Sequence, residues 1–179
     1  MTQARREETE AAILEAARTL FAEAGFGQVG VRDVAAAAGV NAALVIRYFG
    51  SKEALFEAAV TQNVELDGLF EGSTQQLGEV LVRFMLSKED TGALLALLRS
   101  AANDQAARLL RRDLEALFIA PLSGLMKGRD KRLRAGLVAA QLLGIALARD
   151  VVGSDVLTEA EEAKLIRLYA PQVQALIGD

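Results

Sequence analysis

Residues 29–56, with the sequence VGVRDVAAAAGVNAALVIRYFGSKEALF, decide the fold. Small apolar residues recur at helical spacing in the first third of this stretch, which predicts a short helix with one buried stripe. Gly39 stands where a left-handed residue would end that helix, because glycine adopts positive φ without steric cost. Asn41 is placed to cap a second helix over about residues 42–48. Two short helices joined by a glycine turn predict a helix-turn-helix.

A helix-turn-helix has two interpretations. In DNA-binding proteins its second helix enters the major groove, but the same pattern also occurs in all-helical proteins that never bind DNA. The charge supports a local interface, because residues 28–52 contain three basic residues and one acidic residue, whereas the whole chain has a net charge of −4. We therefore expect any DNA-binding surface to be a small patch on an acidic protein, with weak non-specific binding.

The composition excludes several classes of protein. The 179 residues are 52% hydrophobic and include 2 prolines, no cysteine and no histidine. Such a composition predicts an all-α fold with a substantial core, and it excludes disulfides, histidine or cysteine zinc sites and histidine-based catalytic triads. We expect no enzymatic activity, no cofactor and no metal. The N-terminus lacks the apolar segment of a secretory signal and residues 136–148 are too short to span a bilayer, so we expect a cytoplasmic protein.

Further helices are expected on both sides of the turn unit. Apolar spacing predicts a first helix over residues 9–24, preceded by Arg5 and Arg6 on a flexible arm. Ser51 is placed to cap a helix that continues towards Phe70. Later helices are expected to start at Ser73 or Thr74, Thr91, Asn103, about Asp130 and Thr158, with a kink or end at Pro121.

The runs ILEAARTLFAEAGF and VRDVAAAAGVNAALVIRYFGSKEALF resemble the N-terminal domain of the TetR family of transcriptional repressors across residues 9–60. The similarity includes the glycine of the turn and the closing segment Phe-x-Ser-Lys-Glu-x-Leu. It implies a three-helix DNA-binding domain over residues 7–67, with the turn unit at about residues 30–49. Residues 68–179 would then form a helical effector-binding and dimerisation domain, giving an all-α protein of about nine helices.

The resemblance and the usual docking geometry predict the residues that contact DNA. Arg47 is expected to bind a base edge, since arginine pairs well with guanine, and Tyr48 and Lys52 are expected to contact phosphates. Two alternatives stay open: an ion pair between Arg47 and an acidic residue such as Asp33, and a Tyr48 that packs under the turn. The predicted DNA-binding residues are Arg32, Asn41, Ala42, Ala43, Leu44, Arg47, Tyr48 and Lys52.

Two positions depart from the family pattern. Gly30 stands where the family commonly has a serine or threonine that caps a helix and touches a phosphate, and Ile46 replaces a tyrosine that contacts a phosphate. These departures predict fewer hydrogen bonds to DNA than is usual in the family. Leu44 is placed to contact thymine methyl groups instead.

The C-terminal part contains small residues spaced four apart, which would let another helix approach closely. We expect the last two helices to pair with their copies in a second chain, forming a four-helix interface of a two-fold homodimer. Burial within one protomer is the alternative. The predicted interface residues are Gly136, Ala140, Gly144, Ala148, Leu165, Leu168, Tyr169, Val173 and Leu176.

The resemblance also implies a small, largely apolar effector that binds the helices between the two ends and releases the DNA. Ordinary core packing is the alternative for every candidate residue. The candidates are Phe70, Phe84, Met85, Leu95, Leu98, Arg99, Asn103, Phe118, Met126 and Gln141.

The sequence thus predicts a ligand-responsive transcriptional regulator that binds a palindromic double-stranded DNA operator as a homodimer, with repression favoured over activation. The alternative is a helical small-molecule or protein-interaction module without DNA binding. The operator, the regulated genes and the identity of the effector do not follow from the sequence.

Overall fold

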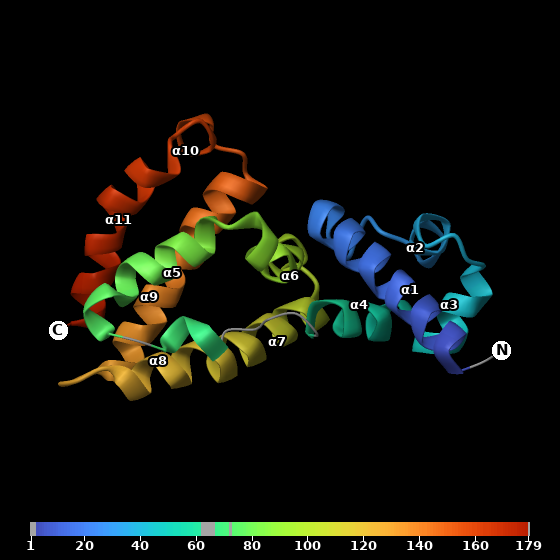
Figure 1. The fold of residues 1–179 in the computed structure, drawn as a ribbon, viewed down its shortest axis with the longest axis horizontal. Coiled ribbons are helices and arrows are strands. Elements are labelled where there is room, and N and C mark those ends of the chain that lie inside the picture. Colours follow the sequence, from blue (N-terminus) through green and yellow to red (C-terminus); the bar gives the residue numbers. More distant parts are fainter. Residues whose placement is uncertain (1–2, 62–66, 72, 179) are drawn as a thin grey trace. The chain divides into compact units, whose positions relative to one another are not determined.

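The computed structural model describes residues 3–61, 67–71 and 73–178, and over these residues the fold is helical with no strand (Figure 1). The described residues form ten α-helices when α7 (Asp104–Asp113), the π-helical stretch η3 (Leu114–Ile119) and α8 (Ala120–Leu125) are counted as one continuous helix. About nine helices were expected. This confirms the all-α fold class. Within the described part of the chain, no helix is both long enough and apolar enough to cross a membrane.

The chain divides into two compact units. One contains Met1–Val64 together with Gly92–Leu110, and the other contains Glu65–Thr91 together with Arg111–Asp179. These units differ from the domain boundary expected after residue 67, because the chain returns to the first unit after leaving it. The boundary between the functional domains stays a prediction.

The first unit is built on two pairs of packed helices, α1 with α4 and α2 with α3. Its core contains a group of aromatic rings: Phe21 and Phe56 pack edge to face with centroids 4.9 Å apart, and Phe26 lies against both. The helices that begin this unit are α1 (Gln3–Ala24), α2 (Val31–Ala37), α3 (Ala42–Phe49) and α4 (Lys52–Thr61).

The predicted turn chemistry of the first unit is confirmed. Gly39 adopts φ +66° between α2 and α3, and Gly25 adopts φ +74° after α1. The Asn41 side chain accepts a hydrogen bond from the Ala43 N–H at 2.8 Å, and Ser51 Oγ accepts one from the Ala54 N–H at 3.1 Å. Each side chain satisfies a donor that the start of its helix would otherwise leave unpaired.

Two expectations for the first unit are wrong. Arg5 and Arg6 do not lie on an arm, because α1 already begins at Gln3. The Thr9 hydroxyl donates to the Arg5 carbonyl at 2.7 Å, so Thr9 lies inside the helix rather than at its start. Helix α4 is described as far as Thr61, and the expected continuation to Phe70 is wrong at its far end, because Phe70 belongs to the short 3-10 helix η1 (Asp67–Phe70). Residues 62–66 of the expected helix lie outside the described residues.

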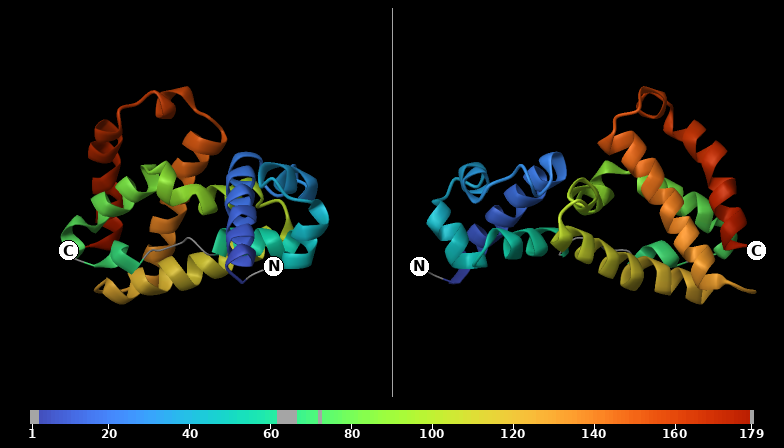
Figure 2. Two further views of the ribbon diagram at one scale, coloured as in Figure 1. Left: turned by 45° about the vertical axis from the view of Figure 1, so that its right-hand side comes forward. Right: turned by 180° about the vertical axis from the view of Figure 1, so that it is seen from behind.

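The second unit packs α5 and α9 against α11, and Figures 1 and 2 show these three helices side by side. At the crossing of α5 and α11, the Gln174 side chain accepts from the Gly78 N–H at 2.8 Å and donates to the Thr74 carbonyl at 2.9 Å. The elements of this unit are η2 (Thr74–Gln76), α5 (Leu77–Leu86), η3 (Leu114–Ile119), α8 (Ala120–Leu125), α9 (Lys131–Ala146), η4 (Leu147–Val151), α10 (Asp155–Thr158) and α11 (Glu162–Ile177).

Helix α6 (Lys88–Arg99) and helix α7 (Asp104–Asp113) have residues in both units. Asn103 caps α7 as predicted, since its Oδ1 accepts from the Gln105 N–H at 3.0 Å. Thr91 does not start α6, which begins three residues earlier, and its hydroxyl instead donates to the Ser87 carbonyl at 2.6 Å.

Three other expected helix signals have mixed outcomes. Ser73 caps η2 as predicted, with its Oγ accepting from the Gln75 N–H at 3.2 Å. Pro121 does not end the helix, but the regular hydrogen-bond pattern changes directly before it, where the π-helical stretch η3 joins α8. Thr158 ends α10 rather than capping α11, and its hydroxyl donates to carbonyls of the preceding turn.

Candidate nucleic-acid interface

Helix α3 has one buried anchor and an open outer face. Val45 is 1% exposed and packs in the core of the first unit. Ala43 and Arg47 are exposed, and so is Ile46, at 44%. Since Asn41 fixes the start of the helix, the side chains on its outer face have a defined direction. A short helix held from one side and open on the other has the form needed to enter a groove.

The predicted DNA-binding residues all lie on or beside α2, α3 and the start of α4. Those with exposed side chains are Arg32, Asn41, Ala43 and Arg47. Those that are half-buried are Ala42, Leu44, Tyr48 and Lys52. The structure therefore brings the whole set together on the first unit, while their contact with DNA stays a prediction.

Arg47 does not form the alternative ion pair with Asp33. Among the described residues Arg47 has no ion pair, and the Asp33 carboxylate instead accepts from the Gly30 N–H at 2.7 Å. The bond also explains how α2 starts without a serine or threonine at position 30. Asp33, the third residue of α2, reaches back with its carboxylate and accepts a hydrogen bond from the Gly30 N–H, which would otherwise be unpaired.

Tyr48 and Lys52 each take part in a contact between a cation and an aromatic ring. Tyr48 packs at the edge of the core, and the Arg6 guanidinium lies over its ring at 5.7 Å from the centroid. Lys52 Nζ lies 4.2 Å from the centroid of the Phe26 ring. Both distances are within the range of cation–π attraction. The ring of Phe26 thus holds one predicted phosphate contact in place.

The contact of Arg6 with Tyr48 does not follow from the apolar pattern of the sequence. The apolar stripe of α1 begins only after Arg5 and Arg6, so periodicity indicates an arm there. The helix-forming composition of residues 3–8 was a usable signal, since Gln, Ala, Arg and Glu all favour helix.

The candidate effector residues do not share one unit. Those in the second unit are Phe70, Phe84, Met85, Phe118, Met126 and Gln141, and those in the first unit are Leu95, Leu98, Arg99 and Asn103. Two of the latter have structural partners, because Arg99 donates to the Ala22 carbonyl and Asn103 caps α7. In the second unit, the rings of Phe70 and Phe118 pack edge to face at 5.8 Å.

Two buried acceptors in the second unit have no hydrogen-bond partner among the described residues. They are Gln141 Oε1 and Asp113 Oδ2. A buried acceptor without a donor costs free energy, so each is a position where a hydrogen-bond donor would be stabilised.

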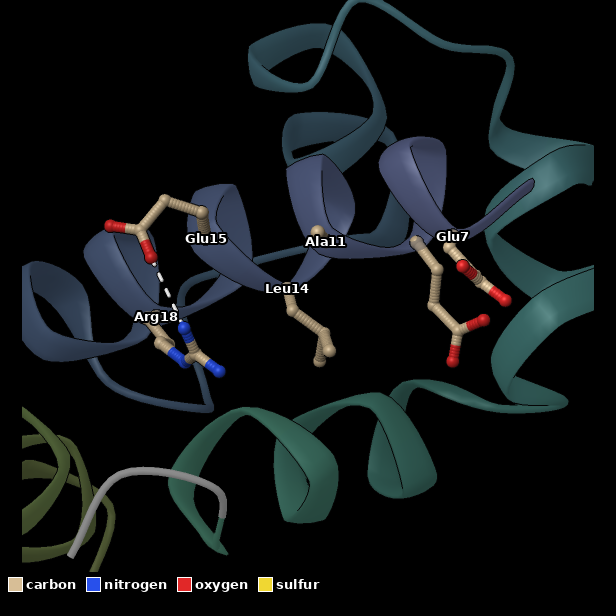
Figure 3. Close-up of a pocket in the computed structure, with 6 residues that line it drawn as sticks. Glu7, Ala11, Leu14, Glu15 and Arg18 are labelled. Atoms are coloured by element: carbon tan, nitrogen blue, oxygen red, sulfur yellow. Dashed lines mark hydrogen bonds and ion pairs between the residues drawn. The ribbon is translucent and has the colours of Figure 1, made fainter. Parts of the chain in front are cut away.

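Both units contain hollows lined by described residues. A cavity of 120 Å³ beside α5 is lined by Phe70, Leu77 and Val80 among others, and a groove of 360 Å³ runs between α5 and α11. The third, of 470 Å³, lies along α1 in the first unit, where Figure 3 shows the Glu15–Arg18 ion pair at one end, Leu14 in the middle and Glu7 at the other end. Only Phe70 among the predicted effector residues lines any of them.

The predicted interface residues fall into three groups: exposed, partly exposed and buried. On α9, Ala140 and Gly144 are exposed, and a side chain at Gly136 or Gly144 would meet nothing within 4 Å. Leu168 on α11 is 58% exposed, and the partly exposed residues are Gly136, Ala148, Tyr169 and Leu176. Leu165 and Val173 are buried inside the protomer, which favours for these two residues the alternative of burial within one protomer.

The exposed face of α9 is more apolar than the predicted stripe of small residues. Leu133 and Leu137 on α9 are exposed, and so is Leu147 at the start of η4, at the three-and-four spacing that places them in one row with Ala140 and Gly144. Tyr169 does not lie in this row. Its hydroxyl donates to the Gln141 carbonyl at 2.8 Å, and burial raises the pKa of its phenol.

Comparison with known proteins agrees with this architecture. A model of bacterial regulatory proteins of the tetR family matches residues 13–59, and a model of the tetracyclin repressor-like C-terminal domain matches residues 75–177. The chain is 37% identical over 99 residues to the HTH-type transcriptional repressor Rv3405c of Mycobacterium tuberculosis. The matched segment covers 50% of this chain and 53% of that protein. The chain thus spans about half the length of the curated relatives it matches.

Solved structures match over almost the whole chain. A TetR-family regulator from Streptomyces coelicolor A3 is 30% identical with a TM-score of 0.60, and the match covers 100% of this chain and 98% of that one. A complex of SmeT with triclosan has the same fold, with 18% identity, a TM-score of 0.70, and coverage of 96% and 93%. The fold therefore defines an all-helical protein with an N-terminal helix-turn-helix unit. The chain belongs to the TetR family.

Proposed function

We propose that this chain is a ligand-responsive repressor that binds a palindromic DNA operator as a homodimer. The observation that carries the proposal is the geometry of α3: Val45 anchors the helix, and Arg47 lies on its exposed side without an ion pair among the described residues. An arginine that has no acidic partner is available to bind a guanine edge. The repressor Rv3405c, which resembles the matched half of the chain, supports repression over activation.

The exposed row on α9, together with Leu168 on α11, supports the homodimer. Large apolar side chains in one row are unfavourable in water, and a second copy of the same face would remove them from it. A two-fold dimer presents two recognition helices about 34–36 Å apart, one turn of DNA, and so implies a palindromic operator. We expect this regulator to act in the cytoplasm, where its DNA would be.

The second unit supports a small effector with an apolar body and a hydrogen-bond donor. Phe118, Met85 and Met126 supply buried apolar surface, and Gln141 Oε1 supplies a buried acceptor without a partner among the described residues. The triclosan complex of SmeT, a protein of the same fold, is a precedent for an apolar ligand with a donor group.

The test is a selection of random-sequence duplex DNA by the full chain, followed by anisotropy titrations of the selected site at two salt concentrations. We expect a palindromic consensus, an affinity at least about 10³-fold above that for scrambled DNA, and weaker binding at higher salt. Enrichment of no sequence would favour the alternative, a helical module that binds a small molecule or a protein without DNA.

A further inference from the structure

The C-terminal end of α6 holds the loop that follows α1. Arg99 Nη1 donates to the Ala22 carbonyl at 2.5 Å, and Ser100 Oγ accepts from the Phe26 N–H at 2.7 Å. The Ser100 hydroxyl also donates to the Ala96 carbonyl at 2.6 Å, and the residue is only 4% exposed. All of these residues belong to the first unit, although 74 residues separate Ser100 from Phe26 in sequence.

The chain is shaped for this close approach. Gly25 adopts φ +74°, and a Cβ at this position would lie 3.2 Å from Arg99 Cβ and 3.3 Å from the Arg99 carbonyl oxygen. The glycine therefore serves both the end of α1 and the approach of α6. The Phe26 N–H is buried beneath α6, so removing the Ser100 acceptor would leave a buried donor unpaired, which costs free energy.

Phe26 connects this contact to the predicted DNA interface. Its ring lies between those of Phe21 and Phe56, whose centroids are 6.2 Å and 5.1 Å from the Phe26 centroid. Lys52 Nζ lies 4.2 Å from the Phe26 ring centroid. The direction of the Lys52 ammonium group thus depends on the position of the Phe26 ring. The position of that ring depends in turn on where Ser100 holds the Phe26 main chain.

We propose that Ser100 is a positioning residue for the phosphate contact of Lys52, acting through the Phe26 main chain and ring; this rests on the proposed DNA-binding function. Helix α6 has residues in both compact units, and Ser100 follows its last residue.

A double-mutant cycle between Ser100→Ala and Lys52→Ala tests the proposal, with the selected operator as the probe. Ser100→Ala should weaken operator binding by about three- to tenfold in the wild-type background, the range for loss of one hydrogen bond. In the Lys52→Ala background it should cause no further loss, because the group that Ser100 positions is already absent. Equal losses in both backgrounds, or no loss in either, would overturn the proposal.

Ser123→Ala is the matched control, because the Ser123 hydroxyl makes only a local bond in α8, to the Ala120 carbonyl at 3.0 Å. It should leave the operator affinity unchanged. A wild-type chain that selects no DNA sequence overturns the proposed function as well, whereas specific binding with additive losses overturns only the role of Ser100.

Ser100→Cys provides a second measurement that survives if Ser100→Ala fails to fold. The substitution is nearly isosteric, the thiol is a weak acceptor, and it is the sole thiol in a chain without cysteine. We expect a thiol reagent to label it slowly, and severalfold more slowly when operator is bound, because ordering Lys52 on a phosphate favours the closed contact. Labelling at the same rate with and without operator would overturn the proposal.

Discussion

Arg47 and Lys52 are both cations of the candidate interface, yet their surroundings differ. Arg47 is exposed and has no ion pair among the described residues, whereas Lys52 is half-buried over the Phe26 ring. A long exposed side chain can adapt to a base edge, while a cation held on a ring is directed to one place. The two residues therefore suit different tasks, base recognition and phosphate binding.

We predict that Arg47→Ala relaxes the sequence preference at one base pair. The loss should be about 1–3 kcal/mol for the preferred base and much less for the others, since a bidentate pair with guanine would be removed. Titrations against operators with every single-base change would measure this. Arg129→Ala, which removes an exposed arginine from the loop before α9, is the control and should not alter the profile.

Lys52→Ala should weaken binding to all sequences to the same degree. One phosphate contact fewer lowers the slope of log K against log salt by about 0.9, and this slope is the quantity to measure. A change confined to one base pair would instead show that Lys52 reads sequence.

At the scale of elements, the crossing of α5 and α11 depends on one position without a side chain. A Cβ at Gly78 would lie 2.7 Å from the Ala170 carbonyl oxygen and 2.8 Å from Gln174 Cβ. The Gly78 N–H also donates to the Gln174 side chain, and this hydrogen bond requires the same close approach of the two helices. The helices would have to separate to accept any larger residue.

Gly78→Ala should destabilise the protein by about 1–3 kcal/mol, because the added methyl group overpacks a backbone contact. Thermal and urea unfolding, followed by circular dichroism, would measure the loss. Gly124→Ala in α8 is the matched control, since a Cβ there would meet nothing within 4 Å. It should be neutral or stabilise by up to about 1 kcal/mol, as alanine favours helix over glycine.

At the scale of the whole molecule, the exposed row on α9 determines the assembly we expect. Leu137 on α9 and Leu168 on α11 are 46% and 58% exposed, and both carry large apolar side chains. Leu165 and Val173, on the same helix as Leu168, are buried and stabilise the protomer instead. Substitutions in the first pair therefore test assembly, and substitutions in the second pair test folding.

The double substitution Leu137→Glu and Leu168→Glu should convert the homodimer to a monomer at micromolar concentration. Four carboxylates would be placed in one apolar interface, and an unpaired buried charge is strongly unfavourable. Sedimentation velocity would give the assembly state, and operator affinity should fall because a monomer contacts one half-site. Val156→Glu is the control, since Val156 is 81% exposed on α10 and is not a member of this row.

The sequence alone determined the local structure of the first unit. Gly39, Asn41 and Ser51 act over two to four residues, and each has the predicted turn or cap. Such signals are readable because positive φ and unpaired helix donors constrain the residue type at one position. The family resemblance over residues 9–60 could be recognised because such constrained turn and cap positions form part of its motif.

Only the tertiary structure decided which distant residues meet. The return of residues 92–110 to the first unit, and the bond from Phe26 to Ser100, depend on burial and close approach between elements far apart in sequence. The same holds for the apolar stripe of α11, because periodicity does not tell whether a stripe faces the protomer core or a second chain. Leu165 and Leu168 fitted one pattern, yet packing against neighbouring helices buried the first and left the second exposed.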